Sequence, residues 1–296
     1  MKILLPVIII CLFITESFAQ QDPLYAQYFN NPMLINPAVA GSNERLFVGL
    51  GYRKQWSGLD GSPTTFNFNS HMALANDKLG AGLIVVQDKF GEFKTTQYGA
   101  ALSYKIKLTH STFSFGMQAG VVQYSTNLEG LNVLNPDKLF APFSEMKFNT
   151  GVGLLLKNER YTVGLSVPQL LKNSVSQGGT DIKVQGQNFY LYGDYLFFLS
   201  EDIEFKPSTL LRMTDGSPLS VDLNLNLTFN RLYTAGVFTR NANTYGVLVQ
   251  MIMKNVRLGY VFELPGKSSA LNFNTHEVSL ALSLGVLKSH GAVVKF

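Results

Sequence analysis

Apolar and polar residues alternate one by one along most of this chain, whereas the spacing of an amphipathic helix is almost nowhere visible. The clearest stretch is "LSVDLNLNLTF" at 219–229, where Leu, Val and Phe alternate with Ser, Asp, Asn and Thr. Residues 112–121 and 277–286 repeat the pattern. Because successive side chains of a β-strand point to opposite faces, this period of two predicts an all-β fold whose strands have one apolar and one polar face.

About fourteen such strands are predicted, and most are close to the roughly 9–11 residues that a tilted strand needs to cross a bilayer. An even number is typical of single-chain outer-membrane barrels. We therefore expect a transmembrane, antiparallel outer-membrane β-barrel over residues 45–296. The predicted strands are 45–53, 63–75, 78–87, 94–107, 111–124, 146–157, 159–167, 187–199, 202–212, 219–230, 231–241, 243–254, 255–264 and 275–286.

The connections between these strands alternate in length. Every second connection is a turn of a few residues, such as "TH" at 109–110 or "NR" at 230–231. The connections between those turns include the long ones, which are 54–62, 125–145, 168–186 and 265–274. Short periplasmic turns and longer outer loops are the usual asymmetry of outer-membrane barrels. The pattern therefore predicts an N-terminus in the periplasm of a Gram-negative bacterium.

Composition separates a membrane barrel from a soluble β-sandwich or lectin-like domain, whose strands would alternate in the same way. Charged residues make up only 15% of the chain, against about 25% in ordinary soluble domains. The polar face of the strands is mostly Gly, Ser, Thr, Asn and Gln, which suits a barrel interior better than a solvated surface. Aromatic residues near strand ends suit the interfacial girdles of a barrel. They are Phe66, Tyr104, Tyr124, Phe148, Tyr161, Phe229, Tyr233, Tyr245 and Phe262.

Residues 1–19 have the form of a secretory signal peptide, with Lys2, the apolar run "ILLPVIIICLFIT" and the small residue Ala19. A membrane-anchoring helix is the alternative, but the run is shorter than the roughly 20 residues that a spanning helix needs. We expect cleavage between Ala19 and Gln20. Cys11, the only cysteine, lies inside this run. The mature chain is therefore predicted to lack disulfides, thiol catalysis and cysteine-bound metal.

Motifs of catalysis and cofactor binding are absent from the sequence. It has no nucleophile elbow, no phosphate-binding glycine loop and no paired-histidine spacing, so we predict no catalytic, cofactor-binding or metal-binding residue. The net charge of +4 is not gathered into a basic cluster, which argues against nucleic acid as a partner. Charges on the polar strand faces are expected to pair across the lumen, with a charge-selective conduction path as the alternative. These charges include Arg45, Arg53, Lys105, Glu204, Lys206, Arg212, Asp222, Arg257 and Glu263.

The segment 20–44, which precedes the first strand, is rich in aromatic residues and contains two Asn-Pro steps, at 31–32 and 36–37. Each step disfavours helix at the asparagine and starts a turn. A disordered leader would not need so many aromatic residues. We expect this segment to pack against the periplasmic mouth or into the lumen, or to be captured by a periplasmic partner.

Four stretches of the chain resemble the PorP/SprF family of outer-membrane proteins. They are "QDPLYAQYFNNPMLINPAVAG", "GYRKQWSGLDGSPTT", "QDKFGEF" and "HEVSLALS", in the family's order. The first two are specific, and the last two are weak by themselves. The resemblance implies a non-enzymatic barrel of the type IX secretion and gliding-motility apparatus, needed for export or surface attachment of proteins with a C-terminal sorting domain, many of them large adhesins. It also implies contacts with periplasmic and lipoprotein components of that apparatus.

The family's motif residues are expected to be structural or to contact a partner, and none has a catalytic role to transfer. In the second motif, Gly58, Gly61 and Pro63 suit a turn, and Trp56 is expected to anchor at the membrane interface or to cap the lumen. The first motif falls on Gln27, Tyr28, Asn36, Pro37, Ala38 and Gly41. The second falls on Tyr52, Arg53, Gln55, Trp56, Gly58, Gly61, Pro63 and Thr64, and the third on Asp88 and Gly91.

The C-terminus departs from the expected pattern. "LKSHGAVVKF" follows the last predicted strand, so the terminal aromatic residue, Phe296, stands beyond it. A terminal aromatic residue usually marks the final strand of an outer-membrane barrel. Either the last strand is longer than predicted, or a tail extends into the periplasm.

Three functional classes are compatible with a barrel of this kind. The first is an accessory barrel that captures or anchors an exported protein, and the second is a channel or transporter for small or hydrophobic solutes. A lumen occupied by the N-terminal segment would favour the first, and an open lumen the second. An outer-membrane phospholipase or protease would need a clustered Ser/His or Asp/His site, which the sequence does not suggest. The sequence does not identify the client, or decide between secretion, anchoring and motility.

Overall fold

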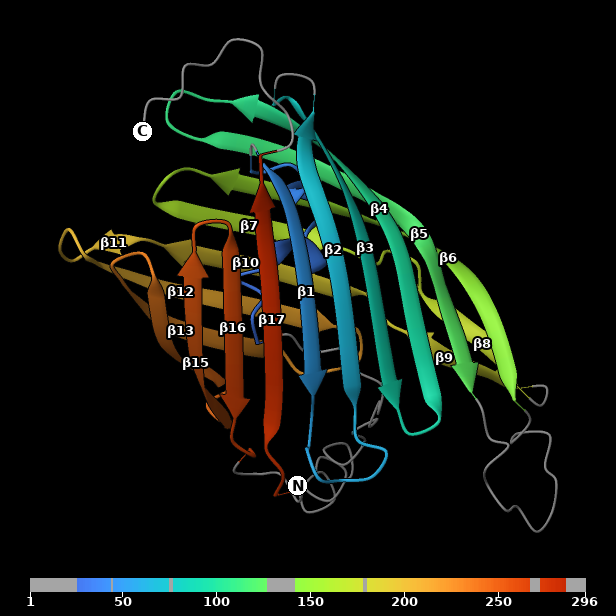
Figure 1. Cartoon of the computed structure of the whole chain (residues 1–296). Coiled ribbons are helices and arrows are strands. Elements are labelled where there is room, and N and C mark those ends of the chain that lie inside the picture. Colours follow the sequence, from blue (N-terminus) through green and yellow to red (C-terminus); the bar gives the residue numbers. More distant parts are fainter. Residues whose placement is uncertain are drawn as a thin grey trace, which may run out of the picture.

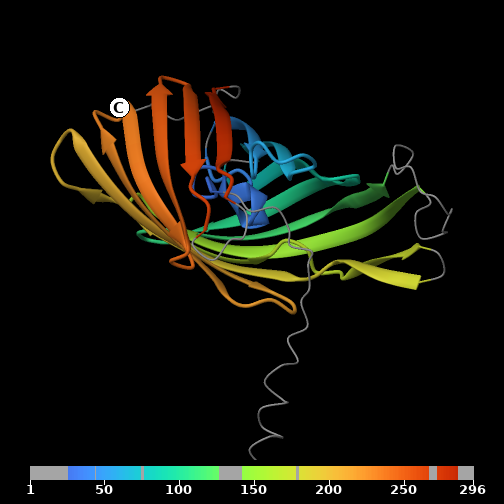
Figure 2. The ribbon, with the colours of Figure 1, turned by 90° about the horizontal axis from the view of Figure 1, so that it is seen from below.

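The computed structural model describes residues 26–43, 45–74, 77–126, 142–177, 180–266 and 272–285. These residues form a closed antiparallel β-barrel, and two short 3-10 helices lie inside it (Figures 1 and 2). The described part contains no helix that is long and apolar enough to cross a membrane.

The wall of the barrel is a sequence of hairpins. Its strands are β1 (Leu46–Lys54), β2 (Thr64–Leu74), β3 (Leu79–Phe90), β4 (Phe93–Lys107), β5 (Thr112–Thr126), β6 (Phe143–Lys157), β7 (Tyr161–Val167), β10 (Asn188–Tyr195), β11 (Phe197–Phe198), β12 (Ile203–Thr214), β13 (Ser220–Phe229), β14 (Tyr233–Arg240), β15 (Thr244–Met253), β16 (Val256–Glu263) and β17 (Thr275–Leu284).

The barrel closes because its first and last strands pair. Leu50 of β1 lies opposite Phe68 of β2 on one side and opposite Leu280 of β17 on the other. Among the described residues the main sheet has fifteen strands. Of these, β11 continues β10 beyond Leu196 along the same neighbour, β12. Counting β10 and β11 as one interrupted crossing leaves fourteen (15 − 1), which confirms the predicted fold class.

Alternation along the strands separates a polar interior from an apolar exterior, as β13 illustrates. Its Asp222, Asn224 and Asn226 are buried, whereas Leu223 and Leu225 are each 49% exposed in the isolated chain. An apolar outward face is stable in lipid and would be costly in water. The exposed apolar residues of the wall are thus the surface that the membrane covers.

Tight turns and long loops lie at opposite ends of the barrel. The turn between β13 and β14 is built on Asn230 and Arg231, whose φ angles are 49° and 55°. Positive φ at both central residues is the geometry of the type I′ turns that join twisted antiparallel strands. We call this end, where the chain enters β1 and leaves β17, the short-turn end, and the other the long-loop end.

Residues 168–186 are not the open loop that the sequence suggested. They contain a separate hairpin of β8 (Asn173–Gln177) and β9 (Thr180–Gln185). Val175 of this hairpin is 1% exposed and packs against Val122 and Tyr124 on the inner face of β5. Tyr124 therefore faces the lumen, and its assignment to the interfacial girdle was wrong because the alternation places it inward.

The last strand ends at Leu284. The predicted tail and Phe296 lie outside the described residues, so the two interpretations of the C-terminus stay open.

Candidate functional site

The most distinctive feature of the barrel is its filled interior. Residues 26–43, which we call the plug, lie inside the barrel (Figure 2), with Ala26 bonded to Glu277 near the long-loop end and Gly41 bonded to Lys105 near the short-turn end. The plug contains the helices η1 (Pro32–Leu34) and η2 (Pro37–Val39), and each begins at the proline of an Asn-Pro step. Proline suits the first turn of a helix because its missing N–H would have no partner there. Asn36 caps η2 by accepting a hydrogen bond from Ala38 N at 2.9 Å.

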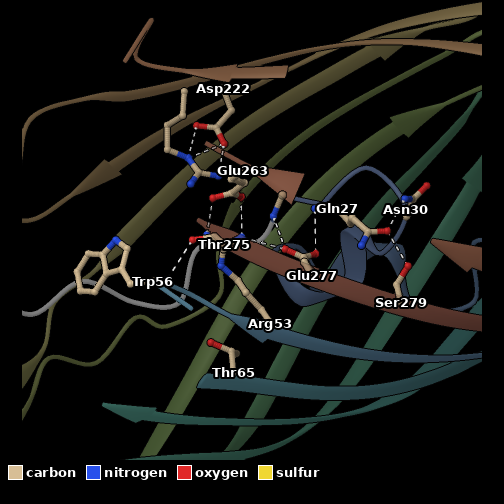
Figure 3. Close-up of polar contacts among 12 residues, drawn as sticks. Gln27, Asn30, Arg53, Trp56, Thr65, Asp222, Glu263, Thr275, Glu277 and Ser279 are labelled. Atoms are coloured by element: carbon tan, nitrogen blue, oxygen red, sulfur yellow. Dashed lines mark hydrogen bonds and ion pairs between the residues drawn. The ribbon is translucent and has the colours of Figure 1, made fainter. Parts of the chain in front are cut away.

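An ion-pair cluster fixes the start of the plug at the long-loop end. Arg53 of β1 donates to both carboxylate oxygens of Glu263, at 2.6 and 2.8 Å, and to Glu277 Oε2 at 3.2 Å (Figure 3). Glu277 in turn accepts from the backbone N–H groups of Ala26 (3.0 Å) and Gln27 (3.3 Å). The carboxylate of Glu277 thus joins the plug to the arginine of the wall.

The plug is also held by its own side chains along its length. Gln27 Oε1 accepts from Ser279 Oγ at 2.6 Å, and Asn224 Nδ2 donates to Tyr28 Oη at 2.8 Å. These bonds tie the first residues of the plug to the inner faces of β17 and β13.

Hydrogen bonds between backbone groups and side chains join the plug to the wall toward the short-turn end. Ser166 Oγ donates to Ile35 O at 2.6 Å, and Asn36 Nδ2 donates to Leu154 O at 2.9 Å. Ser103 Oγ and Lys105 Nζ donate to Ala40 O and Gly41 O, each at 2.6 Å. Buried backbone groups outside regular structure need such partners, and here the wall supplies them.

Glycines make room for the plug on the inner wall. A Cβ atom at Gly116 would lie 2.4 Å from Ala38 N, and one at Gly80 would lie 2.0 Å from Ala40 O. Real Cβ atoms do not approach other atoms so closely, so these positions accept only glycine while the plug is seated. Cβ atoms at three further positions, Gly82, Gly153 and Gly164, would lie 2.1, 2.0 and 2.9 Å from side-chain atoms of the plug (Met33 Cε, Asn36 Oδ1 and Asn36 Nδ2), so those side chains would have to shift. We call these five residues the glycine track.

The hairpin loop forms a second insert. Gln118 Nε2 donates to Pro168 O at 2.7 Å, and Asn149 Nδ2 donates to Leu171 O at 2.9 Å. Both side chains are on the inner faces of β5 and β6, so the chain after β7 turns inward rather than away from the barrel. Two segments of the protein itself therefore occupy the lumen.

The structure brings the sequence motifs into contact with one another. The residues of the first motif, Gln27, Tyr28, Asn36, Pro37, Ala38 and Gly41, are all buried in the plug. Arg53 of the second motif reaches the plug through Glu277. The second and third motifs meet where Gly91 N donates to Gly61 O at 2.8 Å and Thr65 Oγ1 donates to Asp88 Oδ1 at 2.5 Å.

Other residues of the second motif shape the loop after β1. Trp56, Gly58 and Gly61 have φ angles of 51°, 102° and 70°, and Gln55 N donates to Pro63 O at 3.0 Å. The indole of Trp56 points away from the ion-pair cluster (Figure 3), while its backbone N–H donates to Thr275 Oγ1 at 3.3 Å. Tyr52 faces outward and is 50% exposed, and Thr64 opens β2. The predicted cleavage site, Ala19 and Gln20, lies outside the described residues.

The sequence analysis did not identify the wall residues that bind the plug. Glu277 was assigned no role, although alternation against Val278 and Leu280 places it inward. The glycine track had no signal of its own, because its members come from four separate strands. Ion pairs do form on the inner wall, but between nearby strands rather than across the lumen. Arg53 of β1 pairs with Glu263 of β16, and Asp222 of β13 pairs with Arg240, directly opposite on β14, whose Nη2 lies 2.8 Å from Asp222 Oδ2. Arg45, by contrast, is exposed and bonds Asn255.

The side chains that line the lumen hold the plug and the hairpin loop by hydrogen bonds, ion pairs and packing. No group of three or more His, Cys, Asp or Glu side chains suited to a metal ion exists among the described residues. Fold and site together define the class: this is an outer-membrane β-barrel whose interior is occupied by segments of its own chain.

The family model described as "Type IX secretion system membrane protein PorP/SprF" matches residues 17–282. The chain therefore belongs to the PorP/SprF family, as the motifs indicated, and to a secretion family of the outer membrane. No curated protein sequence matches it.

Solved structures that resemble the chain are outer-membrane barrels of low sequence identity. The CymD monoaromatic hydrocarbon channel has a TM-score of 0.58 at 11% identity, with 92% of this chain and 96% of that chain covered. A Pseudomonas aeruginosa FadL homologue has a TM-score of 0.47 at 12% identity, covering 91% and 95%. Omp33 of Acinetobacter baumannii has a TM-score of 0.48 at 7% identity, covering 81% and 98%. At such identities the likeness to CymD supports the fold alone.

Proposed function

We propose that this protein is a non-enzymatic accessory barrel of the type IX secretion and gliding-motility apparatus. It supports the export or surface anchoring of a client protein that carries a C-terminal sorting domain, and it does so by protein–protein recognition. Family membership supports the assignment to the apparatus. The observation that carries the rest is the plug, which is hydrogen-bonded to the wall along its length and takes up the space that a transport path would need.

In this proposal the short-turn end faces the periplasm and the long-loop end faces the outside of the cell. The signal peptide is removed between Ala19 and Gln20, and the plug, which begins at the long-loop end, leads the chain back through the lumen to the periplasmic end, where β1 begins. Periplasmic and lipoprotein components of the apparatus bind the short-turn end, whereas outer-membrane lipids cover the apolar face. The loop after β1 holds the barrel mouth in shape, with direct contact to an exported partner as the alternative role.

The alternative function is a channel or transporter for small or hydrophobic solutes. Its support is a likeness of fold to the CymD channel. A solute path through the middle of the lumen would require the plug to move, against the hydrogen bonds that hold it.

A crosslinked pull-down from outer membranes, with partners identified by mass spectrometry, tests the proposal. The tagged full chain should recover type IX components or a large protein with a C-terminal sorting domain. A matched variant lacking residues 22–40 should lose these partners while the barrel still assembles. Recovery of the full chain alone, together with solute passage through the purified barrel, would instead establish the transporter.

A further inference from the structure

One row of directly opposed residues can be followed around the outer face of the wall. Each member lies opposite the next on a neighbouring strand, so the row runs roughly perpendicular to the strands from β13 to β4. Its members are Leu225, Val237, Val247, Phe262, His276, Lys54, Thr64, Lys89 and Lys94. The row is apolar as far as Phe262 and contains three lysines beyond it. We call Lys54, Lys89 and Lys94 the lysine row.

The lysine row faces away from the lumen. Alternation along β1 places Lys54 on the same side as the exposed Tyr52 and opposite to the buried Arg53. Residues directly opposite each other on neighbouring strands point to the same face of the sheet, so Lys89 and Lys94 face outward as well. Figure 1 shows that β1, β2, β3 and β4 have their long-loop ends side by side, and these lysines lie there.

Strand tilt places the lysine row at the edge of the band that lipid covers. Neighbouring strands are about 4.8 Å apart, and a tilt of roughly 40° makes the row rise by about 3 Å along the bilayer normal at each strand. Leu225 lies at the middle of β13, and His276 is four strands further along the row, so His276 lies about 12 Å higher. That is half the height of the apolar band, which is roughly 25 Å tall. The lysines follow His276 and therefore lie at and above the level of the lipid headgroups.

Aromatic side chains mark the same boundary. The next outward-facing row toward the bilayer centre is Tyr260, Val278, Tyr52 and Phe66, which are again directly opposed and are 39–50% exposed in the isolated chain. Tyr260 Oη lies 2.7 Å from His276 Nδ1. Because tyrosines are enriched where a barrel passes from lipid to water, this second feature also places the headgroups at the lysine row.

The lysine row has no counter-charge in the described part of the chain. Lys54 Nζ donates only to neutral oxygens, at 3.2 and 3.4 Å. Lys89 and Lys94 lie directly opposite each other and have no side-chain hydrogen bond or ion pair with a described residue, although Glu92 lies in the turn between their strands. Like charges at directly opposed positions are destabilising, and an anion bound between them would remove that cost.

We propose that the lysine row binds phosphate groups of a lipid headgroup in the leaflet at the long-loop end. The ammonium groups contact the phosphate oxygens, as lysines commonly do, and the acyl chains lie on the apolar outer face below Tyr52 and Phe66. The position of the row, on the lipid-facing side at the level of the headgroups, favours a lipid over a soluble anion. The inference rests on the proposed function only for the orientation that makes this leaflet the outer one.

Native mass spectrometry of the full chain, purified in a nonionic detergent, tests the proposal. The probes are bisphosphorylated lipid A, the same lipid A after removal of its phosphates, and inorganic phosphate as a competitor. We expect saturable binding of the phosphorylated lipid and binding of the dephosphorylated lipid that is about tenfold weaker or less. Millimolar inorganic phosphate should not displace the lipid.

Variants assign the binding to the lysine row. The double variant Lys89→Gln/Lys94→Gln should weaken binding of the phosphorylated lipid about tenfold or more, because each lysine near a membrane surface adds to the attraction for anionic lipid. The double variant Lys89→Arg/Lys94→Arg keeps both charges and should bind like the original chain. Lys107→Gln is the matched control, since it removes an exposed lysine from the opposite end of β4.

The proposal is overturned if the two forms of lipid A bind equally, if inorganic phosphate displaces the lipid, or if Lys107→Gln weakens binding as much as the glutamine double variant. Unchanged lipid binding in that double variant, together with loss of its protein partners in the pull-down, would overturn it in favour of a protein contact. Failure of lipid binding leaves the proposed function intact if the pull-down of the full chain still recovers partners, so the two failures are distinguishable.

Discussion

At the residue scale, Arg53 holds three parts of the molecule together. Its side chain is 3% exposed, its guanidinium contacts two carboxylates, and one of these binds the first N–H groups of the plug. A buried ion pair contributes little net stability by itself, because burying the charges costs nearly as much as their attraction returns. Removing one partner is strongly destabilising, since it leaves the other charge buried and unpaired.

Arg53→Gln should therefore lower the free energy of unfolding by about 3–5 kcal/mol, because Glu263 and Glu277 lose their counter-charge. Urea titration of the barrel in lipid vesicles, followed by the mobility shift of folded barrels on gels, measures the change. Arg231→Gln, which breaks the exposed pair with Glu204, should change stability by less than about 0.5 kcal/mol. Equal losses in the two variants would show that burial of the Arg53 cluster does not matter.

The glycine track gives a second prediction at this scale. Gly116→Ala should destabilise the barrel by about 1–3 kcal/mol and raise the protease sensitivity of the plug, because the new methyl group displaces Ala38. Gly99→Ala is the matched control, since a Cβ there would have its nearest neighbours at 4.0 Å. If both variants unfold at the same urea concentration, the plug does not press on the wall at Gly116.

At the element scale, the wall strands could be predicted from the sequence because the alternation within each strand shows which of its residues face lipid and which face the lumen. Alternation along β13 fixes which residues face lipid, and the tight turn at Asn230 and Arg231 fixes its register with β14. The hairpin of β8 and β9 was missed because its strands are short. The Gly-Gly pair between them in the sequence is nevertheless a common signal for such a turn.

The position of the plug could not be predicted in the same way. The Asn-Pro steps indicated two turns, and η1 and η2 begin there. The destination of the segment, at the mouth or inside the lumen, depends on glycines and serines from many wall strands. Those residues meet only after the barrel has closed, so no local pattern records them.

Charge on the outer face of β13 should be penalised according to depth. Leu225 lies at the middle of the strand and faces outward. Leu225→Arg should cost about 2–4 kcal/mol of stability, because the charge would sit near the bilayer midplane. Leu219→Arg, just before the strand begins, should cost about 0–1 kcal/mol. The same urea titration measures both, and equal costs would contradict the assigned position of the membrane.

At the scale of the whole molecule, the barrel combines a wall that suits a channel with an interior that does not. The barrel is closed by the pairing of β1 with β17, in which no plug residue takes part. The plug and the inward-folded hairpin are therefore additions to a complete barrel. This arrangement is what one expects if the wall serves as a rigid frame for contacts at its two ends.

The most direct test of a closed lumen is the conductance of single barrels in planar bilayers, for the full chain and for the variant lacking residues 22–40. Both proteins should fold, because the wall ladder is intact in each. The full chain should show little or no conductance, and the deletion variant should open stable channels. A full chain that conducts as well as the deletion variant would contradict the closed lumen and favour a transporter.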